Sequence, residues 1–566
     1  MNINSKSKKE STFDAIVVGT GISGGWAAKE LTEGGLKTLV LERGRDVKHV
    51  KDYPTMNKNS WELPYRDQLT AKERKHYKVQ SRTGYTLKQS TKHWWIKDTD
   101  QPYNEKKGSF DWIRGYHVGG KSIMWSRHVY RWSKIDFEAN AKDGIGIDWP
   151  IRYKDIEKWY GHVENFIGVS GMKEGLSQLP DGNFLPPLDM NCVERDFKKN
   201  LFDKLGRTYT SGRVTNITKN HNGRGKCQSR NLCIRGCPYG AYFSSNSSTL
   251  PAAEATGNMT LKANSIVHSI IYDNEKNKAT GVRVLDSETL EIKEYFAKII
   301  FLNASTINTT LIMLNSKSRR FPNGFGNDSG ELGHNIMDHH FKAGARAQID
   351  GYEDYYYYGN RPANGYLARF RNLGNESMNY LRGFGYQGGA KRGGWANSGE
   401  GAFTGENLLK KASTPGGWTM NLLGFGEILP YHDNKMYLDN EKLDKWGMPT
   451  VVFETSIREN EKKMREDMKN SAAEMLEKCG FKNVKGYDNK YDMGNGIHEM
   501  GTARMGKDPK TSVLNKWNQV HSAKNVFITD GACMTSASCV NPSITYMALT
   551  ARAANYAISE LNKRNL

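Results

Sequence analysis

One histidine and one asparagine near the end of the chain have the side chains that alcohol oxidation requires. His498 begins the segment His-Glu-Met-Gly-Thr-Ala-Arg-Met-Gly, and Asn541 begins Asn-Pro-Ser further along. Oxidising an alcohol to a carbonyl removes a hydroxyl proton and a carbon-bound hydride, and a neutral imidazole is a suitable base near neutral pH. An amide beside it can hydrogen-bond the same oxygen. A single histidine is most often structural, but within this segment we predict that His498 is the base and Asn541 its partner.

A hydride needs an acceptor, and the N-terminal segment has the glycine spacing of a dinucleotide-binding site. Gly19, Gly21 and Gly24 follow a predicted buried strand over residues 12–18 and open a predicted helix over 25–33. Glycines let backbone N–H groups approach a phosphate closely, and the helix N-terminus adds a favourable dipole. An ordinary glycine turn is the alternative, but the strand and helix on either side favour a diphosphate site.

A second predicted strand, over 37–42, ends in an acid where the ribose of a dinucleotide would lie. Glu42 can accept hydrogen bonds from the adenosine ribose hydroxyls, and Arg43 follows it. The two strands and the helix between them form a β-α-β unit, in which the strands run parallel.

FAD rather than NAD is predicted from the other end of the chain. A buried strand is predicted over 525–530 and ends in Asp530 and Gly531, which returns the last strand to the first. This return is typical of flavoproteins, and Asp530 would lie near the pyrophosphate or the ribityl chain. A closing helix is predicted over 542–563, directly after Asn541, and its N-terminus would stabilise the negative charge of reduced flavin.

Three cysteines lie close together in the middle of the chain. Cys227, Cys233 and Cys237 share one short segment, and Pro238 follows the last of them. Zinc sites usually contain CxxC pairs with a fourth ligand nearby, which this spacing does not match. The C-x3-C-P ending is shared with ferredoxin-type loops, and three thiolates suit an iron–sulfur cluster with three cysteine ligands. A disulfide, free thiols and another metal are the alternatives.

Composition narrows the classes of protein to which the chain can belong. Its 566 residues, 37% hydrophobic content and 7 cysteines describe a globular protein rather than a disordered chain, a fibrous chain or a disulfide scaffold. The net charge of +20 is scattered without a nucleic-acid motif, so we expect no nucleic-acid partner and favour an acidic redox partner or an anionic membrane face. No apolar stretch approaches the length of a membrane span, and residues 1–11 lack an export signal.

The sequence resembles the glucose–methanol–choline (GMC) oxidoreductase family over essentially its whole length. The resemblance is carried by the N-terminal fingerprint, the loop Gly119-Gly-Lys-Ser-Ile-Met-Trp125, the segments 303–314 and 333–339, and His498 with Asn541. Within the family it is similar to a sugar dehydrogenase branch that uses a His–Asn pair. This branch includes glucoside 3-dehydrogenase, gluconate 2-dehydrogenase and the flavoprotein subunit of bacterial FAD-glucose dehydrogenase.

The resemblance implies a fold, cofactors and site residues. The fold would be an α/β FAD-binding Rossmann-like domain plus an α+β substrate domain with a large antiparallel sheet. FAD would be non-covalent, because Met124 stands where pyranose 2-oxidase has the histidine that bonds to it. The three cysteines would hold a 3Fe–4S cluster. The residues expected to bind FAD are Gly19, Gly21, Gly24, Glu42, Arg43, Gly119, Gly120, Ser122, Asp530, Gly531, Asn541, Pro542 and Ser543.

The chain is expected to pass between the two domains several times. The FAD-binding domain would comprise residues 10–47, 111–150, 205–335 and 485–566. The substrate-binding domain and its excursions would comprise 48–110, 151–204 and 336–484, and the cysteine loop 225–240. Arg127, near the flavin loop, and Trp395, whose ring suits the C–H face of a sugar, are candidates for contacting the substrate.

The expected activity is oxidation of a ring hydroxyl of a sugar or glycoside to a ketone, for example at C3 of a glucoside. Hydride would pass to N5 of FAD, and electrons would leave through the cluster to a cytochrome. The alternatives are a gluconate 2-dehydrogenase-type or polyol dehydrogenase, a pyranose oxidase-like enzyme that uses O2, and a flavin-binding subunit without turnover. Related multi-subunit dehydrogenases imply a small twin-arginine-exported subunit, a c-type cytochrome and a periplasmic location by co-export; a cytoplasmic enzyme is the alternative.

Overall fold

The computed structural model describes residues 8–83, 86–355, 362–393, 405–406, 408–409 and 415–566. Its largest sheet has eight strands, with β16-β17-β8-β1-β2-β5 in one path, β7 beside β8 and β6 beside β7. The parallel strands are β1 (Lys8–Val18), β2 (Thr38–Leu41), β5 (Met259–Lys262), β8 (Ile292–Leu302) and β17 (Ala523–Ile528). The antiparallel additions are β6 (Ser265–Asp273), β7 (Lys278–Asp286) and β16 (Gln519–Val520).

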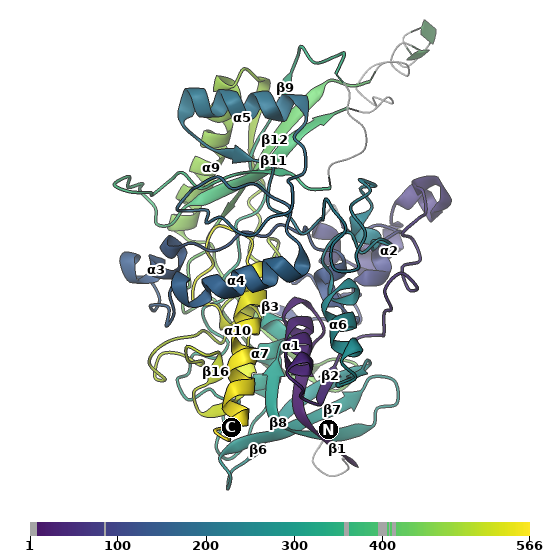
Figure 1. Cartoon of the computed structure of the whole chain (residues 1–566), viewed down its shortest axis with the longest axis vertical. Coiled ribbons are helices and arrows are strands. Elements are labelled where there is room, and N and C mark those ends of the chain that lie inside the picture. The colour runs from purple at the N-terminus through teal and green to yellow at the C-terminus, as the bar shows by residue number, and fades with distance from the viewer. Residues whose placement is uncertain (1–7, 84–85, 356–361, 394–404, 407, 410–414) are drawn as a thin grey trace.

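This sheet is buried on both faces, as the apolar runs of its strands predict. Ile16 and Val18 of β1 belong to one apolar cluster, whereas Ala15 and Val17 belong to the cluster on the opposite face. In Figure 1 the helices α10, α1 and α6 lie side by side in the lower body. The helices around the sheet are α1 (Ile22–Glu33), α4 (Tyr153–Ile167), α6 (Thr249–Ala255), α7 (Thr306–Asn315) and α10 (Ser543–Asn562).

A second sheet forms the upper body in Figure 1 and is antiparallel throughout. Its order is β15 (Lys482–Asp488), β9 (Ala343–Ile349), β12 (Trp418–Gly426), β11 (Phe384–Arg392), β10 (Gly365–Leu367) and β4 (Tyr209–Thr210). The helices α5 (Cys192–Leu205) and α9 (Glu459–Lys478) pack on one face of it. Along β11, Tyr386 packs in that core and its neighbour Gln387 points to the other face, because side chains alternate along a strand.

Smaller elements join the two bodies. A third sheet has the order β13 (Lys435–Leu443), β14 (Pro449–Glu454) and β3 (Asn104–Lys107), and the helices α2 (Ala71–His76) and α3 (Lys134–Asp143) lie outside the sheets. Among the described residues, no helix has both the length and the apolar composition needed to cross a bilayer.

The expected α/β body and the large antiparallel sheet are both present, and the predicted strands over 12–18 and 525–530 correspond to β1 and β17. The first helix begins at Ile22, earlier than predicted, because Gly24 and Gly25 let it pack closely against its neighbours. The elements β4 and α4 do not follow the expected domain division, since β4 pairs with β10 of the second sheet and α4 packs against α10 beside the first sheet.

Candidate functional site

A cavity of about 790 Å³ lies between the two bodies and reaches from the end of β1 to the second sheet. Its volume is in the range of cofactor and substrate sites. Gly19, Gly21 and Glu42 line one part of it, and His498, Asn541 and Gln387 line another. The sequence-predicted phosphate and catalytic residues therefore face the same space, although they lie at opposite ends of the chain.

The glycine turn has the shape that a diphosphate requires. Gly19 has a φ of 94°, and a Cβ on Gly24 would lie 2.0 Å from the carbonyl oxygen of Gly19, so α1 packs against the turn only because residue 24 has no side chain. Gly21 is the N-cap of α1 without a side-chain cap, and a Cβ there would meet nothing within 4 Å. The uncapped N–H groups and the open space beside them fit the pyrophosphate of FAD.

This geometry predicts different outcomes for two alanine substitutions. Gly24→Ala forces α1 away from the turn, so we expect it to destabilise even the flavin-free protein by about 1–3 kcal/mol and to lower its flavin content. Gly21→Ala places its methyl group in open space, so we expect flavin content to fall without loss of stability in the flavin-free protein. Thermal unfolding and the flavin-to-protein ratio measure both effects; equal stability of the two flavin-free variants would contradict the packing argument.

Glu42 is fixed at the end of β2 by three donors. Its carboxylate accepts hydrogen bonds from the Thr20 hydroxyl at 2.5 Å, the Thr20 N–H at 3.2 Å and the Gly44 N–H at 3.0 Å. Burial raises the pKa of Glu42 despite these donors. Arg43, which follows, lines the cavity between the rings of Tyr116 and Trp446.

The loop of residues 119–125, which we call the glycine loop, contains η6 (Gly120–Ile123) and closes over the glycine turn at residues 19–24. Gly119 donates its N–H to the Thr20 hydroxyl at 2.9 Å, and Ser122 donates its hydroxyl to the Gly119 carbonyl at 2.5 Å. Gly120, Ser122 and Met124 line the cavity. A thioether cannot form the covalent bond that a histidine forms at this position, so the residues present suit FAD held without such a bond.

The C-terminal residues reach the same cavity. Asp530 accepts hydrogen bonds from the Thr309 hydroxyl at 2.6 Å and the Ala532 N–H at 3.0 Å, and burial raises its pKa to about 6. Gly531 lies beside it in the lining. Pro542 is the N-cap of α10 and Ser543 its first residue, so the N-terminus of α10 starts directly beside Asn541.

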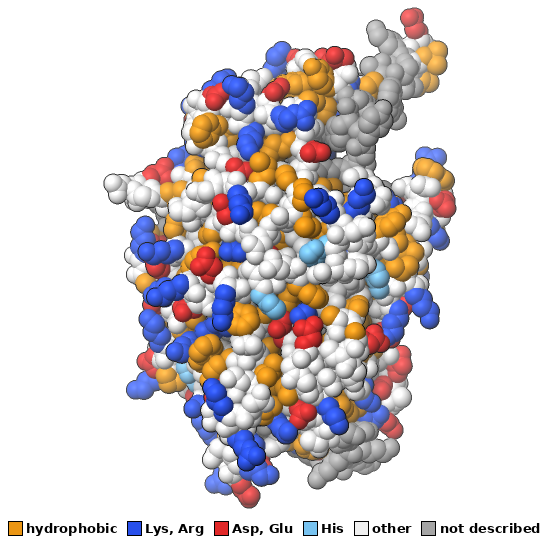
Figure 2. Space-filling model, in the orientation of Figure 1, with side chains coloured by type: hydrophobic (Ala, Val, Ile, Leu, Met, Phe, Trp, Pro, Cys, Tyr) orange, Lys and Arg blue, Asp and Glu red, His pale blue; other side chains and the backbone are white. Residues whose placement is uncertain are grey.

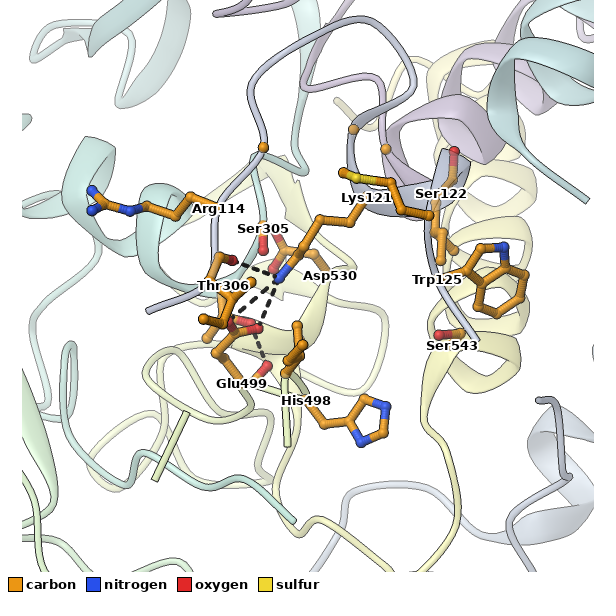
Figure 3. A pocket seen from close by; sticks show the side chains of 18 of the residues that line it. Arg114, Lys121, Ser122, Trp125, Ser305, Thr306, His498, Glu499, Asp530 and Ser543 are labelled. Atoms are coloured by element: carbon orange, nitrogen blue, oxygen red, sulfur yellow. Dashed lines mark hydrogen bonds and ion pairs between the residues drawn. The ribbon is translucent and has the colours of Figure 1, made fainter. Parts of the chain in front are cut away.

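A buried carboxylate holds the backbone that carries His498. Asp338 accepts hydrogen bonds from the N–H groups of Gly494 at 2.7 Å, Gly496 at 3.1 Å and His498 at 3.0 Å. Burial and the nearby charge of Glu499 raise the pKa of Asp338 to about 7. Figure 3 shows Lys121 pointing from the glycine loop toward Glu499, beside His498, and the Nζ–Oε2 distance is 3.3 Å.

The protonated nitrogen of His498 is fixed by a second histidine. His339 Nε2 lies 3.0 Å from the carbonyl oxygen of Ala537 and 2.9 Å from that of Ser538, so Nε2 must carry a hydrogen. Burial lowers the pKa of His339 to about 4, which leaves its Nδ1 with a lone pair. The 2.8 Å contact between the two Nδ1 atoms then requires His498 to donate from Nδ1. The lone pair of His498 is therefore on Nε2.

Asn541 is oriented from the second sheet. Gln387 donates from Nε2 to Asn541 Oδ1 at 2.6 Å, which directs Asn541 Nδ2 to His498 Nε2 at 3.4 Å. The predicted pair of His498 and Asn541 is thus brought together. Three residues that fix this pair were not predicted from the sequence. His339 and Asp338 lie in the segment 333–339, which carries the family resemblance, but no role was assigned to them. Gln387 is a polar residue in a buried strand, and nothing else in the sequence indicates its contact with Asn541.

We predict that His339 acts on the reaction through His498. In His339→Phe the acceptor for His498 Nδ1 is lost, so kcat should fall about tenfold to a hundredfold with flavin content unchanged. In His339→Asn a side-chain oxygen near the same position can accept that hydrogen, so kcat should be higher than in the phenylalanine variant. Steady-state dye reduction measures both; equal kcat values in the two variants would indicate that the ring only fills space.

The protonation state of His498 leads to a further prediction. Burial is the main cause that lowers the pKa of His498 well below its ordinary value of 6.5, and the nearby positive charge of Lys121 lowers it further. The neutral, basic form therefore persists as pH falls through 6.5. We expect kcat/KM for dye reduction to stay level through that pH and to decline only at lower pH. A decline centred above it, at constant flavin occupancy, would contradict this assignment.

The cysteine loop lies against the glycine loop. Cys227, Cys233 and Cys237 are free thiols that line one small cavity, and burial is the main cause that raises the pKa of Cys227 and of Cys237. Among the described residues, no three His, Cys, Asp or Glu side chains are gathered closely enough to hold a metal ion. Tyr242 joins the two loops, since its hydroxyl lies 3.0 Å from the Cys233 carbonyl and also contacts the Ile123 carbonyl.

The two candidate substrate residues have different outcomes. Arg127 lines the cavity, but its guanidinium donates to the carbonyl oxygens of Trp125 at 2.5 Å and Pro362 at 3.2 Å. Trp395 lies outside the described residues.

Comparison with known proteins identifies the family. GMC oxidoreductase family models match residues 13–341 and 430–550. The 2-methyl-1,2-propanediol dehydrogenase of Mycolicibacterium austroafricanum is 27% identical over 96% of this chain and 94% of its own length. The fructose dehydrogenase large subunit of Gluconobacter japonicus is 25% identical over 98% of this chain and 100% of its own length. Pyridoxine 4-oxidase from Mesorbium loti shares the fold, with a TM-score of 0.59 at 14% identity over 96% of this chain and 98% of that one. The chain belongs to the GMC oxidoreductase family, whose members are FAD-dependent enzymes that act on CH–OH groups.

Proposed function

We propose that the protein is a dehydrogenase that oxidises a ring hydroxyl of a sugar or glycoside to a ketone, for example at C3 of a glucoside. The observation that carries this proposal is the lone pair of His498 Nε2, which faces the cavity beside Asn541 Nδ2. A separation of 3.4 Å is long for a hydrogen bond, and a substrate oxygen bound by both groups would replace it.

Each group in the site has one task in the proposed reaction. His498 Nε2 takes the hydroxyl proton, and Asn541 Nδ2 donates to the same oxygen and holds it in place. Bound FAD supplies the acceptor for the hydride that leaves the carbon, so the alcohol loses two electrons and becomes a carbonyl. His339 accepts from His498 Nδ1 throughout, which stabilises the imidazolium that forms.

We further propose that Cys227, Cys233 and Cys237 bind an iron–sulfur cluster, of the 3Fe–4S type. Support comes from their spacing, from the cavity that they share and from the contact of Tyr242 with both loops. The thiols would have to move together to ligate it, because they are not gathered in the present structure. Such a cluster would pass electrons singly to an outside acceptor, for which we propose a c-type cytochrome.

A multi-subunit arrangement accompanies this proposal. The name of the fructose dehydrogenase relative, a large subunit, favours a complex with further subunits. We propose a small twin-arginine-exported subunit as the second component, with the periplasm as the location.

A small diol or polyol is the second candidate substrate, because one of the relatives is a 2-methyl-1,2-propanediol dehydrogenase. A panel of sugars, glycosides, gluconate and diols with product analysis separates the two. Iron and acid-labile sulfide analysis with an absorption spectrum of the protein as isolated tests the cluster. If the protein contained neither iron nor acid-labile sulfide and consumed O2 as fast as it reduced the dye, a pyranose oxidase-like enzyme would be favoured.

A further inference from the structure

The segment that packs on the cysteine loop exposes two large aromatic side chains. Trp61 in η2 (Ser60–Glu62) is 78% exposed, and Tyr65 in η3 (Pro64–Asp67) is 68% exposed. The two short helices contact each other. Aromatic rings turned to solvent are unfavourable for an isolated chain and are enriched where proteins bind one another.

The backbone that displays Tyr65 is strained. Tyr65, Arg66 and Asp67 have φ values of 52°, 50° and 69°, although none is glycine. Successive left-handed residues with side chains are disfavoured, and such strain is retained where surrounding contacts enforce it. The enforcing contacts belong to Asp67, which accepts from the Ser90 N–H at 2.7 Å and the Ser90 hydroxyl at 2.9 Å.

Asp67 also ties this segment to the cysteine loop. Its carboxylate lies 3.1 Å from the guanidinium of Arg235, both side chains are buried, and Arg235 stands between Cys233 and Cys237. Removing one partner of a buried ion pair is strongly destabilising, so the position of Tyr65 is coupled to that of the cysteines. Arg230 makes a second tie, donating to the Met56 carbonyl at 2.6 Å.

The segment that carries the two aromatic rings has mostly positive charge on its exposed side chains. Its exposed bases are Lys51, Lys58, Arg66, Lys72, Arg74, Lys75 and Lys78. Among residues 51–78, Glu62 is the exposed acid. In Figure 2 the edge of the molecule beside α2 shows Lys and Arg side chains around hydrophobic ones. A basic rim around apolar residues suits an acidic protein, whose approach the charge would accelerate.

We propose that the exposed residues of 51–78, which we call the basic aromatic surface, are the docking site of an acidic electron-accepting protein that covers the cysteine loop. This inference rests on the proposed electron relay and adds the surface and the charge of the partner. A lipid bilayer bound to this surface would place hydrocarbon, and not an electron acceptor, against the cysteine loop. The position of the surface therefore favours a protein partner over a membrane.

The test uses the holoenzyme with an acidic c-type cytochrome, a basic c-type cytochrome and a small dye as acceptors. The charge variant is Lys72→Glu, Arg74→Glu and Lys75→Glu together, and the aromatic variant is Trp61→Ala with Tyr65→Ala. Matched controls elsewhere on the surface are Lys462→Glu, Lys463→Glu and Lys510→Glu together, and Phe202→Ala with Leu443→Ala.

We expect the charge variant to lower kcat/KM for the acidic cytochrome by about tenfold or more at low salt, with the difference shrinking as salt rises. The aromatic variant should weaken binding at all salt concentrations, and dye reduction should be unchanged in both. Equal losses in the matched controls, or cytochrome kinetics like those of the parent protein, would overturn the docking surface. The proposal would also be overturned if the parent protein co-sedimented with anionic phospholipid vesicles, the charge variant did not, and the parent protein did not bind the cytochrome.

Cytochrome binding and cytochrome reduction, measured separately, distinguish this surface from the relay. If the charge and aromatic variants lose cytochrome binding, and Cys233→Ser binds the acidic cytochrome normally but does not reduce it, both proposals stand. If the charge and aromatic variants bind and reduce it normally while Cys233→Ser does not reduce it, the relay stands and the docking surface is wrong. If those variants lose binding while Cys233→Ser still reduces the cytochrome, the surface stands and the relay is wrong.

Discussion

Replacement of His498 by alanine should lower kcat/KM for dye reduction by about 10²- to 10⁴-fold while FAD remains bound. His498 Nε2 holds the one lone pair that the hydrogen-bond network directs toward Asn541, and methyl in place of imidazole leaves the hydroxyl proton without a base. The glycine turn and the Asp338 contacts to backbone N–H groups do not depend on this side chain, so flavin content should not change.

His521→Ala is the matched control for this substitution. His521 hydrogen-bonds the Ser512 hydroxyl at 2.9 Å and does not line the cavity, so its loss should leave kcat/KM unchanged. If His498→Ala reduced dye as fast as the parent protein, the chain would be a flavin-binding subunit without a role in turnover. If His498→Ala lost its flavin, the fall in kcat/KM would reflect loss of the cofactor rather than loss of the base. His498→Asn, which changes the size of the side chain less, would then be measured in its place.

The second large effect is expected at the cysteine loop. Cys233→Ser should abolish reduction of an acidic c-type cytochrome and remove iron and acid-labile sulfide, while dye reduction stays near the parent rate. Cys233 lines the small cavity and not the main one, so a dye that takes electrons in the main cavity does not need it. Cys192→Ser, on α5, is the matched control and should retain both activities. Unchanged cytochrome reduction in Cys233→Ser would contradict the relay.

The sequence predicts most strongly where one local pattern is sufficient. The glycines at 19, 21 and 24 act within a single strand–turn–helix unit, and the turn has the close packing that their spacing requires. His498 and Asn541 come together because the loop at 498 and the start of α10 both face the end of the first sheet. The placement of the glycines follows from the strand before them, whereas the loop at 498 follows β15 of the second sheet and α10 follows β17 of the first.

The residues that fix the catalytic pair required the tertiary structure. The contact of His339 with His498 joins residues from different segments, and its meaning depends on the carbonyl oxygens of Ala537 and Ser538. Gln387 reaches Asn541 because β11 turns this side chain to the cavity and its neighbour Tyr386 to the core on the other face. No spacing along the chain encodes these contacts. The strained turn at Tyr65 is likewise set by Asp67 and Arg235, which are far apart in sequence.

The pH dependence of flavin reduction in a single anaerobic turnover tests the central claim most directly. With the parent protein and a sugar substrate, the rate should stay level as pH falls through 6.5, because the base is already neutral. In His498→Ala, solvent must remove the hydroxyl proton, so the rate should be far lower and rise about tenfold for each unit of pH. The same rate and the same pH profile in both proteins would contradict the assignment of His498 as the base.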